Sequence, residues 1–207
     1  MTMGAPAVLY ALADGRATAG GPVYPDGIES AHIDDLNALR LFLLGHLYGR
    51  LRTDRALAAE ACRRGPNGFD TLAFEADIRA ISDVARDAAR WRGRRLLGLA
   101  RRSWGDGLAS WPEELPEPVA LGALAWFGDV TPDGADALAL YAGITSPAWA
   151  VARQIRLDPR DVAALVVDLC AAAPPAAPAG VIPEASSPLA EAAAKVRARR
   201  QLSQHAS

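Results

Sequence analysis

The chain has 207 residues, 51% hydrophobic and 22% charged, which is the length and composition of one globular domain and excludes intrinsic disorder for most of it. Its 22 basic residues, almost all arginine, are outnumbered by 24 acidic ones, and the resulting formal charge of −2 requires neither a nucleic acid nor a membrane as partner. The apolar run 5–13 is too short to span a bilayer, and the distant Cys62 and Cys170 form no CxxC pair, so we expect a cytoplasmic chain without disulfides.

The first strong helical pattern is a run of leucines. They recur at spacings of three and four, which places them on one face of a helix: Leu36, Leu39, Leu43, Leu47 and Leu51. Asp34 or Asp35 precedes this run and can cap its start. Thr53 can then cap a second segment over residues 55–64, which the Gly-Pro-Asn-Gly sequence at 65–68 ends.

The middle of the chain alternates helical and loop signals. Residues 69–81 show a weaker helical pattern, and Ser82 is placed to cap a longer helix that runs to about Arg102. Residues 104–118 are rich in proline and glycine, so we expect mostly loop there.

Two later helix starts share one signal. Thr131-Pro132-Asp133 combines a capping hydroxyl, a proline at the first helical position and an acid in the first turn, and predicts a helix to about Arg156 with a possible kink at Pro147. Asp158-Pro159-Arg160-Asp161 repeats this signal. The apolar stripe of the short helix that follows consists of Val162, Leu165, Val166 and Leu169.

The fold class expected from these patterns is all-α. No segment alternates with period two over more than a few residues, so we predict a single-domain bundle of about seven to nine helices over residues 1–172. From residue 173 to 207 the chain is rich in proline and alanine, which favours a semi-extended linker over packed structure. Residues 188–201 form at most a marginal helix, so we expect a flexible C-terminal tail that docks on a partner.

The sequence offers little support for enzyme chemistry. The glycine-rich stretch 14–29 contains neither a phosphate-binding Walker motif nor a dinucleotide-binding G-x-G-x-x-G. His32, His46 and His205 lack metal-binding spacing, and no G-x-S-x-G nucleophile motif occurs. We therefore expect no catalytic residue, no metal site and no cofactor, and we interpret His46 as a helix-face or interface histidine.

Arginines crowd onto about three turns of the helix expected after Ser82. They are Arg90, Arg92, Arg94, Arg95, Arg101 and Arg102. Three interpretations stay open: a solvated face paired with acids, an acidic protein partner, or a nucleic acid. The five tryptophans are expected mainly in the core, with an interface as the alternative.

Three blocks of the sequence, in order, resemble the UreF family of urease accessory proteins. The stretch 14–29 is similar to the family pattern D-S-R-[LF]-P-x-G-x-H-x-H-S-x-G-[IL]-E, matching at Asp14, Arg16, Gly20, Gly27, Ile28 and Glu29. The block RWRGRRLLGLARRSW matches at Arg94, Leu96, Leu99, Ala100, Arg101, Arg102 and Trp104. The block at 137–159 matches at Tyr141, Thr145, Ala150, Arg153 and Leu157.

The first block also departs from the family pattern. Pro22, Tyr24 and Pro25 stand where the family has two histidines and a serine, and Ala17-Thr18 replaces its apolar-proline pair. The resemblance, which covers roughly residues 7–169, therefore implies a divergent member, and roles that need those histidines are not carried over.

The resemblance implies a protein without enzymatic activity. Members of this family are all-α homodimeric adaptors that join a UreD scaffold, also called UreH, to the GTPase UreG. The complex regulates GTP hydrolysis, takes part in nickel transfer and loads nickel into apo-urease. The C-terminal tail is expected to order against the scaffold, with neither nucleic acid nor membrane as partner.

The resemblance also marks a glycine-shaped contact loop. In it, Asp14, Arg16 and Glu29 are expected to be the polar contact groups or to fix the loop. Gly20 and Gly27 are expected to allow its backbone turns.

Four arginines complete the expected partner-binding set. Arg94, Arg101 and Arg102 are expected to contact an acidic partner surface. Arg153 lies among apolar residues and is expected to be partly buried, with Asp14 or Glu29 as its acid.

Two hypotheses from other classes remain at this point. One is a small helical enzyme or ligand-binding protein with a pocket between helices. The other is a helical regulator that binds nucleic acid through residues 90–102, which predicts an affinity that falls steeply with salt.

Overall fold

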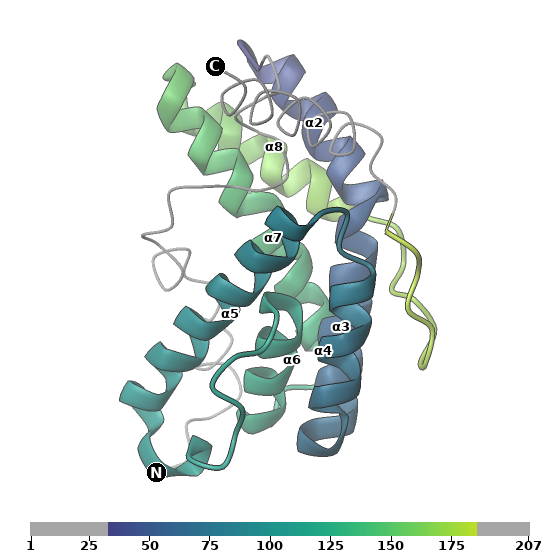
Figure 1. Cartoon of the computed structure of the whole chain (residues 1–207). Helices are drawn as coiled ribbons and strands as arrows, with labels where there is room; N and C mark the ends of the chain where they lie inside the picture. The colour runs from purple at the N-terminus through teal and green to yellow at the C-terminus, as the bar shows by residue number, and fades with distance from the viewer. Residues whose placement is uncertain (1–32, 186–207) are drawn as a thin grey trace, which may run out of the picture.

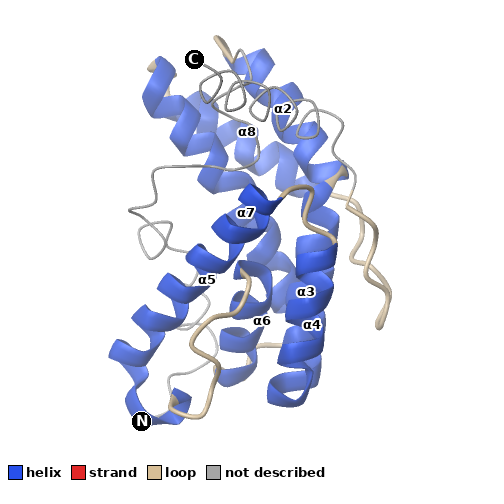
Figure 2. Cartoon of the chain, viewed as in Figure 1, coloured by secondary structure: helices blue, strands red, loops and turns tan. Residues whose placement is uncertain are grey.

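The described part of the structure is built from helices joined by short turns. A computed structural model describes residues 33–185, and Figure 2 shows helices and loops in that range without a strand. The helices are α2 (Leu36–Tyr48), α3 (Arg50–Arg64), α4 (Phe69–Ile78), α5 (Asp83–Trp104), α6 (Glu117–Phe127), α7 (Pro132–Ile155) and α8 (Pro159–Ala171), with 3-10 turns η2 (Gly65–Gly68) and η3 (Gly105–Leu108). This confirms the all-α class; the helix count predicted for the whole chain includes residues outside this range.

Four of the predicted helix starts are confirmed by side-chain caps. A side-chain oxygen of the capping residue accepts a hydrogen bond from a backbone N–H in the first turn, which satisfies one of the unpaired donors there. The caps are Asp35 to Ala38 at 2.7 Å, Ser82 to Ala85 at 3.1 Å, Thr131 to Gly134 at 3.1 Å and Asp158 to Arg160 at 2.8 Å. Helix α7 continues through Pro147 to Ile155, close to its predicted end.

The prediction that Thr53 caps a helix is wrong. Only Gly49 separates α2 from α3, and α3 already begins at Arg50. Thr53 is buried inside α3, and its hydroxyl donates a hydrogen bond to the carbonyl of Pro183 at 2.9 Å. A contact 130 residues away in sequence thus uses the hydroxyl, which no local pattern can indicate.

Helix α6 is the element that the sequence patterns did not reveal. The helix begins at Glu117, near the end of the segment 104–118 that was predicted to be mostly loop, with Pro118 in its first turn. Residues 118–125 are all buried, so the helix has no polar face. A helix buried on every side lacks the amphipathic period by which a sequence signals a helix.

The buried apolar residues gather in two main clusters along the bundle. In Figure 1, α4, α5 and α6 form the lower half with α3, whereas α2 and α8 form the upper half with the C-terminal part of α7. Helices α3 and α7 contribute to both clusters through Leu57 and Leu138 below and through Leu51 and Ile144 above. These two helices therefore hold the halves together.

Residues 173–185, here called the C-terminal strap, lie along α3 at the right edge of Figure 1. The strap is non-helical as predicted, but it is held by side chains of α3, contrary to the expectation of an unpacked linker. Arg55 donates to the carbonyl of Pro174 at 2.8 Å, and Glu60 accepts from the backbone N–H of Gly180 at 2.7 Å. Because prolines lack a backbone N–H, the strap cannot form regular backbone pairing, and side chains of α3 bind its carbonyl and N–H groups instead. These contacts join residues far apart in the chain, so no local sequence pattern shows them. The predicted flexible tail from 186 onward lies outside the described residues, and the boundary at 172 stays a prediction.

Within residues 33–185, no helix is both long and apolar enough to cross a lipid bilayer.

Candidate partner-docking face

Helix α5 presents one apolar side to the bundle and one arginine-rich side away from it. Its buried residues repeat at helical spacing: Ala85, Ala89, Gly93, Leu96, Leu97 and Ala100. They pack mainly against α6, and α5 forms the left edge of the lower half in Figure 1. The opposite side of the helix, where several predicted site residues lie, is held rigidly by this packing.

Two of the arginines fix α5 to neighbouring elements. Arg90 donates to Asp77 of α4 at 3.1 Å, and this hydrogen bond is the main cause that raises the pKa of its guanidinium above the ordinary value. Arg92 forms an ion pair with Glu117 at the start of α6 at 2.5 Å, and its side chain is mostly buried. For these two arginines, the structure supports intramolecular pairing with acids.

The three predicted contact arginines of α5 differ in their surroundings. Arg94 pairs with Glu114, yet 59% of its side chain is exposed. Arg101 donates to the carbonyls of Trp111 and Pro112 at 3.2 and 2.7 Å, so part of its guanidinium fixes the loop before α6. Arg102 is exposed on the same side of the helix.

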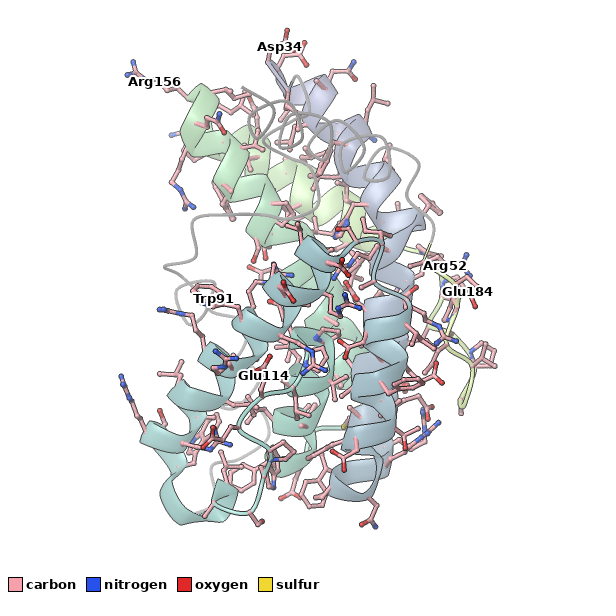
Figure 3. The ribbon with its side chains drawn as sticks, viewed as in Figure 1. Asp34, Arg52, Trp91, Glu114, Arg156 and Glu184 are labelled. Carbon is pink, nitrogen blue, oxygen red and sulfur yellow. The ribbon has the colours of Figure 1, made fainter. Side chains whose placement is uncertain are left out.

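The outer α5 face also includes residues that were not predicted as site residues. The guanidinium of Arg95 stacks over the ring of Trp91 at 4.9 Å in a cation–π contact. Figure 3 labels Trp91 at the left of the molecule. Leu99 is 43% exposed, and Gly98 lies beside it. The outer α5 face is defined as Trp91, Arg94, Arg95, Gly98, Leu99, Arg101 and Arg102. A leucine within a helical stripe reads as core, so only the structure shows that Leu99 is exposed.

Arg153 is not partly buried, contrary to the prediction. It is exposed on α7, although Ala148 and Val151, two of the apolar neighbours that suggested burial, are themselves buried. It lies in the part of α7 that packs with α2 and α8, whereas α5 packs against α6, so the structure does not join it to the outer α5 face. The pairing with Asp14 or Glu29 lies outside the described residues.

The predicted loop residues Asp14, Arg16, Gly20, Gly27 and Glu29 all precede residue 33, so they lie outside the described part of the chain. Their role in contacts stays a prediction.

Burial favours the neutral form of both cysteine thiols, and the effect is greater at Cys62, which is buried, than at the half-buried Cys170. The thiol of Cys62 donates to the carbonyl of Val130 at 3.1 Å, and burial raises its pKa to about 11. Burial also raises the pKa of Cys170. Between residues 33 and 185, no group of three or more His, Cys, Asp or Glu side chains is placed to hold a metal ion.

A small cavity lies where α2, α3, α5, α6 and α7 approach one another. Its polar lining includes His46, Asp54, Arg92, Glu117 and Ser146, and its volume is about 50 Å³. Pockets for drug-sized ligands have volumes of about 300–1,000 Å³. Arg92 and Glu117 are paired with each other across the lining. The cavity therefore gives little support to the ligand-binding hypothesis.

Known proteins match most of this chain. A family model described as UreF matches residues 33–170. The chain is 33% identical to the urease accessory protein UreF of Mycobacterium marinum over 205 residues, covering 94% of this chain and 95% of that protein. It is 36% identical over 165 residues to the protein of the same name from Mycobacterium sp. strain JLS, covering 78% of each, and 34% identical over 169 residues to that of Mycobacterium tuberculosis strain H37Rv, covering 79% of each. No solved structure gives a significant match. The chain belongs to the UreF family of urease accessory proteins.

Proposed function

We propose that this chain is a non-enzymatic adaptor of urease maturation. In this role it acts in the cytoplasm as a homodimer, joins a UreD/UreH-type scaffold to a UreG-type GTPase and regulates GTP hydrolysis while nickel is inserted into apo-urease. Membership of a urease accessory family supports the process, and the exposed face of α5 supports the adaptor role.

The outer α5 face is the observation that carries this proposal. It combines exposed guanidinium groups and a half-buried tryptophan, which are residue types enriched among the strongest contributors to protein–protein binding, with an exposed leucine beside them. Because the inner side of α5 packs in the core, the helix backbone is already ordered, and binding a partner costs little backbone entropy.

The C-terminal strap supports a second contact. Its attachment to α3 fixes the position of the strap up to Glu184, whose label lies at the right edge of Figure 3. We assign the tail that follows to the scaffold protein. We assign Asp14, Arg16, Gly20, Gly27 and Glu29 to contacts between subunits, and Arg153 to a contact apart from the α5 face.

Co-purification tests the adaptor role. The chain is expressed with the cognate UreD-type and UreG-type proteins, and the mass of the complexes is measured with and without GTP and Ni²⁺. The expected result is a ternary complex that loses the scaffold when residues 186–207 are deleted. The matched control is the full chain carrying Arg160→Glu on α8, which keeps the tail. Elution of the full chain alone under every condition contradicts the proposal.

A further inference from the structure

The two glycines inside α5 have different explanations. A Cβ atom added at Gly93 would lie 1.8 Å from the carbonyl oxygen of Leu115, so internal packing requires a glycine there. A Cβ added at Gly98 would meet no atom within 4 Å, and its backbone is ordinary helix. Glycine destabilises a helix interior relative to alanine. Nothing within the described chain therefore accounts for the glycine at 98, whereas close approach by another backbone does.

Gly98 is surrounded by positive charge on the helix surface. Residues three and four positions away are its surface neighbours. At these positions, on both sides, stand Arg94, Arg95, Arg101 and Arg102. Leu99 supplies exposed apolar surface next to this ring, and Glu114 is the acid paired with Arg94.

This charge pattern disfavours a second copy of the chain on the same face. If two α5 helices crossed antiparallel at Gly98, Arg102 of one would face Arg94 of the other, and Arg95 would face Arg101. Like charges placed opposite each other disfavour association by several kcal/mol. Acidic side chains on a different partner would instead lie opposite positive charge at these positions.

A nucleic acid fits less well than a protein. Arg90, Arg92 and Arg94 already pair with Asp77, Glu117 and Glu114, and these carboxylates place negative charge along the helix edge. The phosphate backbone of a nucleic acid also offers no apolar surface to cover the exposed side chain of Leu99, whereas an amphipathic helix does. An amphipathic helix with acids beside apolar residues complements this face: its acids face the arginines, its apolar side chains cover Leu99, and its backbone can approach at Gly98.

We propose that the outer α5 face binds an acidic amphipathic helix of a different protein, which crosses α5 at Gly98. The inference rests on the proposed function in one respect, since the partner is sought first among the UreD-type and UreG-type proteins of urease maturation. Arginine forks bind the carboxylates of this helix, and its backbone approaches α5 where no side chain stands.

Substitutions in the full-length chain test this face. Affinity for the purified cognate UreD-type and UreG-type proteins is measured for wild type, Gly98→Leu and Arg102→Glu. Each variant is expected to bind one of the two proteins at least tenfold more weakly, with the Arg102→Glu effect shrinking as NaCl is raised. The melting temperature of Gly98→Leu is expected to equal or exceed that of wild type, because leucine is the better helix former and its Cβ meets open space. A structural role alone would not separate stability from binding in this way.

Matched controls are Ala164→Leu and Arg160→Glu at exposed positions of α8, which place a leucine and make the same charge change elsewhere on the surface. If wild type binds a partner and both face variants bind it equally well, the proposal for α5 is overturned while the adaptor role stands.

If wild type binds neither protein, the adaptor role fails, and the face is tested with two other probes. These are a synthetic helical peptide with glutamates and leucines on one side, and a 20-base-pair DNA duplex. Peptide binding that Gly98→Leu abolishes supports the proposal. No peptide binding, equal binding by the variant, or a preference for the DNA duplex overturns it.

Discussion

Arg55 of α3 and Asp136 of α7 form a buried bidentate ion pair. The Nε and Nη2 atoms of Arg55 donate to the two carboxylate oxygens at 3.0 and 2.6 Å, and Nη1 donates to the carbonyl of Pro174 in the C-terminal strap. Both residues are at least 90% buried. One guanidinium thus joins the two helices that run through both halves of the bundle and fixes the segment after α8.

Breaking this ion pair on one side is expected to be strongly destabilising. Arg55→Met leaves the carboxylate of Asp136 buried without its cation, which lowers the free energy of unfolding by about 3–5 kcal/mol. The double variant Arg55→Met/Asp136→Leu is expected to lose less than the sum of the two single losses, because neither charge is left behind. Urea unfolding of the four proteins measures the coupling, with Arg52→Met at an exposed position of α3 as control. Additive losses would contradict the expected coupling.

The stability contributed by Glu60 is expected to depend on acid pH. Burial favours its neutral form, but the hydrogen bond from the backbone N–H of Gly180 and the nearby Arg64 and Arg63 outweigh burial and lower its pKa. A lowered pKa means that this stability is present above the ordinary glutamate value of about 4.3 and is lost as pH falls through the lower folded value.

Glu60→Gln tests this expectation in urea unfolding at a series of pH values. The variant is expected to be less stable than wild type at pH 7 by about 1–3 kcal/mol, and this difference is expected to shrink in acid. The control is Glu184→Gln, at an exposed position in the C-terminal strap that Glu60 helps to hold. A difference between Glu60→Gln and wild type that stays constant from pH 7 into acid would argue against the assignment.

The thiol of Cys62 is expected to be unreactive in the folded protein. With a pKa of about 11, roughly one thiol in a thousand is ionised at pH 8, and the thiolate is the reactive form. In Cys170→Ala, the remaining cysteine should therefore react with Ellman's reagent at pH 8 far more slowly in the folded chain than in urea. Wild type, which also carries the less buried Cys170, is the comparison. Equal rates with and without urea would show that Cys62 is accessible.

Alanine at the two interior glycines of α5 is expected to have opposite effects. Gly93→Ala places a Cβ against the carbonyl of Leu115 and is expected to lower the free energy of unfolding by about 1–3 kcal/mol. Gly98→Ala meets open space and is expected to raise it by up to about 1 kcal/mol. Thermal unfolding of the two variants serves as a matched pair. A gain in stability for Gly93→Ala would rule out the close contact with the loop.

Much of the fold could be predicted because its signals are local. Caps at Asp35, Ser82, Thr131 and Asp158 are formed within one turn of sequence, so the residues that form them are adjacent in the chain. Hydrophobic periodicity is equally local, and it predicted the apolar stripes of α2 and α8. Helix α6 was not predicted, because burial on all sides removes that periodicity.

The candidate site was predicted less completely. The sequence placed an arginine cluster on one helix, and its resemblance to the UreF family marked Arg94, Arg101 and Arg102. It could not show that Arg101 holds the loop at 111–112, nor that Leu99 is exposed, since both depend on how α5 packs against the elements that follow it. The expected burial of Arg153 failed for the same reason: apolar neighbours in the chain are not the neighbours in space.

The sequence by itself therefore determined the helical class, most helix starts and membership of the UreF family, because caps, periodicity and family motifs are properties of neighbouring residues. The tertiary structure alone decided which arginines are used inside the protein and which face outward, and it attached the C-terminal strap to α3. Those outcomes depend on carboxylates and carbonyls up to 130 residues away, such as Pro183 beside Thr53, which only folding brings within hydrogen-bonding distance.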